Sequence, residues 1–336
     1  MASQDPIGAV LDGRYRVVSR IADGAMGAVF RGERIKLGRA VAIKFLHAQL
    51  ADEPRFRQRF EIEARTMAKL DHPHCGAVID VGQHGDMPYL VMEFIQGVDL
   101  RHVLDDGRLA PLRAAAIARQ VLAGLAHAHE VGIIHRDVKP ANVMLADRTG
   151  LGEQVRLLDF GLARLREQST GLTVGIAIGT PAYMAPEQAT SGPVDHRTDL
   201  YACGVLLFEM LTGDKPFVAD EPVEILRHQL HSPPPRLADK VPGVDFGGLE
   251  QVVAKAMAKA PADRYGSALE MAAALDDAIA RLAAPPPTTV AAPPPPPAPP
   301  IVPVPEEVRL RRRRLTIAGA VTAAILAIGL IARLAS

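Results

Sequence analysis

The chain has 336 residues, enough for one large or two ordinary domains with a sizeable core. Its 38 basic and 38 acidic residues balance, which argues against nucleic-acid binding by bulk charge. Two cysteines far apart in the chain, Cys75 and Cys203, exclude a disulfide scaffold and suit a reducing compartment. The first ten residues lack a basic segment followed by an apolar one, so we expect no signal peptide.

Residues 15–46 are predicted to form β-strands. Their runs YRVVSRIA, AVFRGERI and AVAIKFL are short, rich in β-branched residues and separated by glycine or polar breaks. Residues 55–70 carry apolar side chains at helical spacing, which predicts an amphipathic helix that is opened by Pro54 and ends before His72. Two more strand-like runs, AVIDVG and YLVMEF, follow this helix.

Helices dominate from residue 111 onward. The segment 111–132 is predicted to be one helix, and the almost wholly apolar segment 196–213 is predicted to be another. A strand-rich part of about 95 residues is therefore followed by a helix-rich part that ends at about residue 283. This order predicts an α+β fold of two lobes with a cleft between them.

The composition changes abruptly at Pro285, since 12 of the residues in 285–305 are proline. A segment of this kind cannot build a core, so we predict an extended polyproline II spacer within a linker at residues 284–308. The alternative is that the segment is a ligand for a proline-recognition domain.

A transmembrane helix is predicted at residues 315–332, an uncharged run that would be roughly 27 Å long as a helix. A buried amphipathic helix is the alternative, but the run has no polar face. Arginines dominate the basic segment 309–314, and by the positive-inside rule they place residues 1–310 in the cytoplasm. Residues 333–336 would form a short extracytoplasmic tail, and the chain would be a single-pass protein of the cell membrane.

Small residues recur every four positions within the predicted membrane helix, at Gly319, Ala323 and Ala327. This spacing suits a helix dimer, although an alanine-rich composition alone often produces it. A homodimer is therefore one of two alternatives, and a single helix is the other.

Gly24 and Gly27 lie between two predicted strands, where glycine lets backbone N–H groups approach a phosphate. Lys44 follows in an otherwise apolar strand, either as a surface residue or as a group that reaches phosphates from inside the cleft. Glu61 and Glu63 lie on different faces of the predicted helix, and one of them could pair with Lys44.

The most informative stretch is HRDVKPAN at residues 135–142, followed by DFG at 159–161 and APE at 185–187. These motifs bring a candidate base, a cationic partner and two oxygen ligands for a metal into one fixed order. A single Asp or His-x-Asp would usually be a cap or a turn, but chance occurrence of the full set is negligible.

On these residues the segment from 15 to about 283 resembles a complete protein kinase catalytic domain. The form of residues 135–142 resembles serine/threonine kinases, and VMEF at 91–94 with GTPAYMAPEQ at 179–188 resembles the bacterial eukaryotic-like membrane kinases. The resemblance implies a bilobal fold with a β-rich N-lobe and a helical C-lobe, preceded by an N-terminal segment at residues 1–14.

The resemblance implies ATP as a substrate and Mg²⁺ as the metal, with Mn²⁺ as an alternative. Lys44 would hold the α- and β-phosphates and pair with Glu63, which stands nine residues before His72 as the family requires. The catalytic set would be completed by Asp137 accepting the substrate proton, Lys139 contacting the γ-phosphate, and Asn142 and Asp159 binding the metal.

The adenine would bind between the lobes, against the backbone of Glu93 and Ile95, with Met92 limiting the pocket. The expected apolar walls are Ile21, Val29 and Ala42. One departure from the family pattern is Ala22, which stands where the glycine loop normally has its first glycine. We expect the added methyl group to weaken ATP binding modestly and not to abolish it.

Regulation is also implied by the resemblance. A phosphorylated loop residue would pair with Arg136 and order the loop, the candidates being Thr173, then Thr170 and Ser169. The remaining expected roles are substrate positioning by Thr180, anchoring of the catalytic loop by Asp199, and a Glu187–Arg264 ion pair.

The sequence therefore predicts a membrane-anchored serine/threonine kinase that phosphorylates cytoplasmic proteins and does not bind nucleic acid. Two alternatives remain, a pseudokinase scaffold that binds nucleotide without transfer and a proline-rich, tail-anchored adaptor. Ala22 is the only support for the pseudokinase.

Overall fold

The computed structural model describes residues 5–24, 27–47, 54–148, 152–160, 181–190 and 192–283. The predicted proline-rich spacer, basic segment and membrane helix lie outside these residues. The three candidate phosphorylation sites Ser169, Thr170 and Thr173 also lie outside them, as does Thr180, the residue expected to position the substrate. Within the described ranges, no helix has the length and apolar character needed to cross a membrane.

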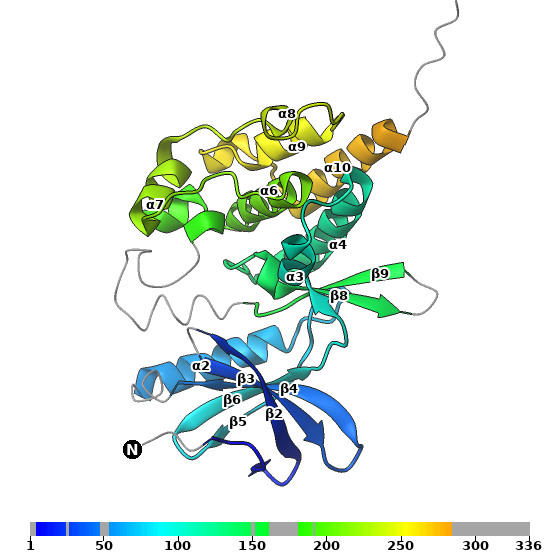
Figure 1. Cartoon of the computed structure of the whole chain (residues 1–336). Helices are drawn as coiled ribbons and strands as arrows, with labels where there is room; N and C mark the ends of the chain where they lie inside the picture. The colour runs from blue at the N-terminus through cyan, green and yellow to red at the C-terminus, as the bar shows by residue number, and fades with distance from the viewer. Residues whose placement is uncertain are drawn as a thin grey trace, which may run out of the picture. The chain divides into compact units, whose positions relative to one another are not determined.

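The N-terminal lobe is built on a six-stranded antiparallel sheet with the order β1-β2-β3-β4-β6-β5. Its strands are β1 (Val10–Leu11), β2 (Tyr15–Gly24), β3 (Gly27–Arg34), β4 (Arg39–Leu46), β5 (Val78–His84) and β6 (Met87–Glu93). Helix α2 (Pro54–Met67) runs beside this sheet, as Figure 1 shows in light blue. The helix predicted over 55–70 is therefore present and ends three residues earlier.

Strand β4 divides its side chains between the two faces of the sheet, because successive residues of a strand point in opposite directions. Val41, Ile43 and Phe45 belong to an outer cluster of buried side chains. Leu46 instead packs in the same core as Phe60 of α2. Lys44 shares the Leu46 face by this alternation, so its side chain emerges on the side of the sheet that faces α2.

The C-terminal lobe is mainly helical. Its helices are α3 (Leu100–Asp105), α4 (Pro111–Glu130), α6 (Arg197–Thr212), α7 (Pro222–His231), α8 (Leu237–Lys240), α9 (Leu249–Ala256) and α10 (Ala268–Ala283). A three-stranded sheet of β7 (Val98–Asp99), β8 (Val143–Arg148) and β9 (Gly152–Leu157) packs on α4. The predicted helices 111–132 and 196–213 correspond to α4 and α6.

Helix α6 is the centre of this lobe, since every residue from Thr198 to Leu211 is buried. Burial on every side is typical of a helix that other elements surround. The helix ends at Gly213, whose φ of 83° is the left-handed conformation that glycine adopts easily at a helix C-terminus.

The two lobes are joined by more than their connecting chain. The Leu157 N–H donates to the His74 carbonyl at 2.9 Å, and the Gly76 N–H donates to the Leu157 carbonyl at 2.8 Å. One hydrophobic core also contains Phe60 of the N-terminal lobe and Leu200 of the C-terminal lobe. The predicted two-lobed α+β architecture is confirmed for the described residues.

Candidate active site

Lys44 and Asp159 form an ion pair between the lobes, with 2.6 Å between Nζ and Oδ2. Lys44 is only 8% exposed, on β4, while Asp159 follows β9 and has a left-handed φ of 62°. Burial alone would raise the pKa of Asp159, but attraction and hydrogen bonding from Lys44 lower it below its ordinary value. A carboxylate and an ammonium are thus held together at the lobe junction.

A second cluster forms around Asp137 in the loop that precedes β8. The Lys139 ammonium donates to Asp137 Oδ2 at 2.7 Å. The Asn142 amide donates to the Asp137 carbonyl at 2.7 Å and to Oδ2 at 3.2 Å. The structure therefore brings three of the predicted catalytic residues into direct contact.

The donor set around Asn142 and Asp159 fits a hard cation. Because the Asn142 side chain uses its nitrogen toward Asp137, its amide oxygen stays available as a ligand. The Leu158 N–H donates to the Asn142 carbonyl at 2.8 Å, which ties the two candidate ligand segments together. A carboxylate and an amide oxygen are ligands that Mg²⁺ accepts, with water completing its coordination.

Asp199 anchors the backbone of the catalytic loop from α6. Its fully buried carboxylate accepts 2.8 Å hydrogen bonds from the His135 N–H, the Arg136 N–H and His129 Nε2. Burial raises the pKa of this carboxyl, but the His129 hydrogen bond and nearby positive charge outweigh it and lower the pKa. This is the contact that the sequence led us to expect.

His135 and Phe160 connect the two motif segments by their side chains. Their ring centroids lie 4.7 Å apart, and His135 Nε2 is 2.7 Å from the Leu158 carbonyl oxygen. Both residues are almost wholly buried. The sequence analysis assigned neither a role, although His135 stands two residues before Asp137 and Phe160 directly follows Asp159.

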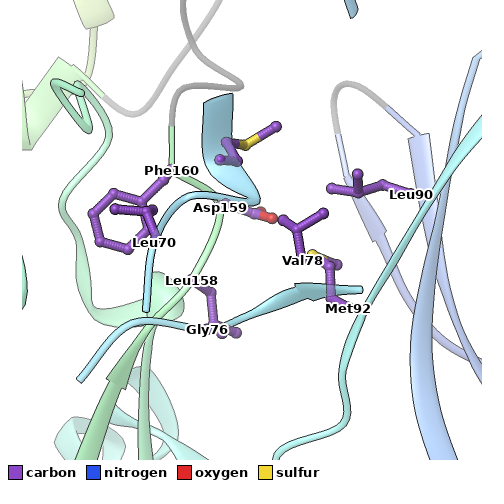
Figure 2. Close-up of a pocket in the computed structure, with 9 residues that line it drawn as sticks. Leu70, Gly76, Val78, Leu90, Met92, Leu158, Asp159 and Phe160 are labelled. Atoms are coloured by element: carbon purple, nitrogen blue, oxygen red, sulfur yellow. The ribbon is translucent and has the colours of Figure 1, made fainter. Parts of the chain in front are cut away.

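An apolar pocket lies next to Asp159, between α2 and the sheet, as Figure 2 shows. It is lined by Met67, Leu70, Gly76, Val78, Leu90, Met92, Leu158, Asp159 and Phe160. Met92 lines this pocket, whereas its predicted role of limiting the adenine pocket stays a prediction. The sequence offered no sign of the α2 contribution.

The residues expected around adenine come together through strand register. Val29 lies opposite Lys44, and Ala42 lies opposite Met92, so these four residues share neighbouring strands. Ile21 lies at an irregularity of β2 and is 51% exposed.

The predicted hinge residues follow the same strands. The Glu93 N–H donates to the Ala77 carbonyl at 2.9 Å, and the Glu93 carboxylate lies 3.6 Å from Arg156. Ile95 is half-buried just beyond β6. The contacts of Glu93 and Ile95 with adenine stay a prediction.

Gly24 and Gly27, which the sequence predicts to approach phosphate, have different steric requirements. A Cβ atom at Gly27, whose φ is 155°, would lie 1.8 Å from the Phe45 carbonyl oxygen. At Gly24 the same atom would make an ordinary 3.5 Å contact. Ala22 pairs with Val29 in β2, so the departure from the family pattern occupies a regular strand position.

Glu63 is half-buried on α2. In this structure the Lys44 ammonium contacts Asp159, and the Lys44–Glu63 pair stays a prediction. Glu187 and Arg264 form the expected ion pair through two hydrogen bonds of 2.6 and 2.7 Å.

Comparison with known proteins agrees with this geometry. The sequence profile of the family described as protein kinase domain matches residues 15–271. Serine/threonine-protein kinase PknL of Mycobacterium bovis is 41% identical over 283 residues, which cover 84% of this chain and 70% of PknL. Serine/threonine-protein kinase pkn2 of Myxococcus xanthus is 42% identical over 83% of this chain and 34% of its own length.

Solved structures show the same fold. The chain is similar to the crystal structure of the Mycobacterium tuberculosis PknI kinase domain. The match covers 81% of this chain and 98% of that one. The TM-score is 0.64 and the sequence identity is 29%. The β-rich N-lobe and helical C-lobe described above are those of this fold.

Proposed function

This chain belongs to the protein kinase family and is a serine/threonine protein kinase, and we propose that it is a membrane-anchored one that phosphorylates cytoplasmic proteins. Kinases of this family use ATP and a divalent metal and act on protein substrates. The observation that carries the assignment of its site is the convergence of Asp137, Lys139 and Asn142 in one hydrogen-bonded cluster.

Asp137 is the proposed acceptor of the substrate hydroxyl proton. Its Oδ2 accepts hydrogen bonds from Lys139 and Asn142, and Oδ1 takes part in neither bond. Oδ1 is therefore the oxygen that we assign to the serine or threonine hydroxyl. The two donors orient the carboxylate, which is the positioning that general-base catalysis requires.

Lys44 and Lys139 are the proposed cations for phosphate charge, and Asp159 and Asn142 are the proposed ligands for Mg²⁺. Phosphoryl transfer spreads negative charge over the transferred group, so fixed positive charge contributes most of the stabilisation. When bound, ATP supplies the phosphoryl group and the cation neutralises part of its charge. The pairing of Lys44 with Asp159 keeps both side chains in place at the lobe junction.

Three further features belong to the proposal. Residues 315–332 would anchor the chain in the membrane, and the arginines of 309–314 would keep the kinase domain in the cytoplasm. Autophosphorylation at Thr173, Thr170 or Ser169 would create an anion for Arg136. A homodimer in the membrane is the partner arrangement that the small-residue spacing supports.

A phosphotransfer assay tests the assignment of the site. The full-length protein is incubated with labelled ATP, Mg²⁺ and a generic basic protein, and Asp137→Asn serves as the control. We expect label on serine or threonine with the wild-type protein and at least about 1,000-fold less with the variant. Equal labelling by both proteins would refute the role of Asp137. The comparisons offer no support for the pseudokinase alternative.

A separate experiment tests the anchor. Membranes from cells that express the full chain or a chain ending at residue 314 are washed with alkaline carbonate. The full chain should stay in the membrane pellet and the shortened chain should be released. Release of both proteins would overturn the membrane anchor without affecting the kinase assignment.

A further inference from the structure

The backbone of Arg136, the residue before Asp137, is held in a strained conformation. Arg136 has a φ of 67°, in the left-handed region that side chains other than glycine rarely adopt. Such a conformation persists only where surrounding contacts hold it, and here those contacts are with side chains of distant elements. Asp199 accepts a hydrogen bond from the Arg136 N–H at 2.8 Å.

The carbonyl of the same residue is held by Gln188. The Gln188 side-chain amide donates to the Arg136 carbonyl oxygen at 3.0 Å, across 52 residues of sequence. This carbonyl belongs to the peptide plane that contains the Asp137 N–H, which itself donates to His135 Nδ1 at 3.2 Å. Side chains therefore hold both the carbonyl and the N–H of the peptide group between Arg136 and Asp137.

Gln188 also holds its own segment. Its Oε1 accepts a hydrogen bond from the Ala185 N–H at 3.0 Å, which caps the short helical turn of Pro186–Ala189. Capping needs only this oxygen and leaves the amide nitrogen for another partner. Because one partner is an N–H and the other a carbonyl, only one orientation of the amide satisfies both.

The segment that Gln188 holds is fixed from its other side by a buried residue of α7. The fully buried Gln229 donates to the Ala182 carbonyl at 2.6 Å and accepts from the Tyr201 hydroxyl at 2.5 Å. The turn at Pro181–Tyr183 therefore cannot shift freely. Gln188 connects a rigid segment to the loop that carries the catalytic carboxylate.

We propose that Gln188 is a positioning residue for phosphoryl transfer, which aligns the Asp137 carboxylate with the 181–190 segment by holding the Arg136 carbonyl. This inference rests on the proposed role of Asp137 as proton acceptor. It assigns Gln188 no contact with substrate. The ATP-side groups Lys44 and Asp159 hold one another directly, so loss of the Gln188 bridge should leave ATP binding intact.

Gln120 offers a matched control. It is another half-buried bridging glutamine, whose Oε1 accepts from the Val155 N–H at 3.0 Å and whose amide donates to the Glu153 carbonyl at 3.1 Å. It joins α4 to β9 and contacts no residue of the 135–142 loop among the described contacts. Substitution at Gln120 and at Gln188 removes the same kind of bridge at two different places.

The test compares Gln188→Glu, Gln188→Met, Gln120→Glu and Gln120→Met in the full-length protein. Each is measured for kcat with a peptide substrate, KM for ATP, and melting temperature. We expect kcat to fall about tenfold or more in both Gln188 variants, with KM for ATP within about twofold of wild type. The Gln120 variants should have a lower melting temperature than the wild type, with a kcat within about twofold of the wild-type value.

The pH profile gives a second readout. In Gln188→Glu an ionised carboxylate faces the Arg136 carbonyl, whereas the protonated carboxyl can donate to it. Its kcat relative to wild type should therefore recover as the pH falls toward 5, and Gln120→Glu should show no such recovery. If Gln188→Met fails to fold, the kcat of the nearly isosteric Gln188→Glu variant alone tests the inference.

Two results would overturn the inference. One is a kcat within twofold of wild type in Gln188→Glu at neutral pH. The other is an equal loss of kcat in Gln188 and Gln120 variants that have lost equal thermal stability. A wild-type protein that transfers no phosphate would instead refute the proposed function, so the two failures are distinguishable.

Discussion

Arg264 donates two hydrogen bonds to the Glu187 carboxylate, at 2.6 and 2.7 Å, and the Arg264 side chain has no exposed surface. The Thr198 hydroxyl adds a third bond to Glu187 at 2.7 Å. The pair thereby connects the turn at Pro186–Ala189 to α6 and to the loop before α10. A guanidinium suits this site because its planar fork matches both carboxylate oxygens.

Breaking this pair should destabilise the protein strongly. Arg264→Ala leaves a buried carboxylate without its cation, which costs about 3–5 kcal/mol of unfolding free energy. Arg264→Lys should rescue little of this loss, since an ammonium cannot make the bidentate contact. Urea denaturation measures the free energy of unfolding of both variants. As a control, the half-exposed pair of Arg119 and Asp276 should contribute at most about 1 kcal/mol, and an equal loss there would contradict the argument.

Substitutions at Gly24 and Gly27 should separate effects on stability from effects on ATP binding. Gly27→Ala places a methyl group against the Phe45 carbonyl, so we expect a loss of about 2–3 kcal/mol. Gly24→Ala has room for the methyl group and should change stability by less than about 1 kcal/mol. It should still raise KM for ATP if, as the sequence predicts, the backbone there approaches phosphate. Thermal melts and ATP titrations of both variants check this, and a stable Gly27→Ala protein would refute it.

Two buried glutamates should respond to pH in opposite directions. Burial opposes ionisation of Glu187, but hydrogen bonds from Arg264 and Thr198 outweigh it and lower its pKa below 4.5. Its stabilisation is therefore present above the unfolded pKa and is lost as the pH falls through the folded value. Burial raises the pKa of Glu209 above 4.5, against the opposing Tyr183 hydrogen bond, so its contribution is lost as the pH rises through that range.

Urea unfolding between pH 3 and 7 tests this contrast with Glu187→Gln and Glu209→Gln. Glu209→Gln should remove a decline in stability above about pH 4.5, while Glu187→Gln should weaken the loss of stability toward acid. Parallel profiles for wild type and Glu209→Gln would show that Glu209 is not perturbed in this way.

The two cysteines should be inert in the folded enzyme. Both are buried, and burial raises the pKa of each thiol to about 12, so almost no thiolate exists at pH 8. A disulfide reagent such as DTNB should titrate no thiol rapidly in the native protein and both in denaturant. Rapid modification of one native thiol would place Cys75 or Cys203 in a more open environment.

Periodicity and motif spacing in the sequence predicted several helices of this molecule, but they did not predict its tertiary contacts. The amphipathic pattern located α2, and the long apolar segments located α4 and α6, because those signals are local. Strands β8 and β9 were missed as strands, since short apolar runs do not distinguish a buried strand from a buried helix.

The same distinction between local signals and tertiary contacts holds for the candidate site. The ordered motifs identified the chemistry of Asp137, Asn142 and Asp159 through family resemblance. No pattern could show that Lys44 would contact Asp159, 115 residues away, or that Gln188 would hold the Arg136 carbonyl. Such bonds depend on where the fold places a backbone carbonyl or a distant side chain, and residue spacing does not encode that.

The backbone pairing of residues 74–76 with Leu157, together with the core shared by Phe60 and Leu200, makes the two lobes interdependent. A chain cleaved in the connection after β6 would yield two fragments, each with an open apolar face. Neither fragment would be a complete folding unit, so we expect neither to be active alone.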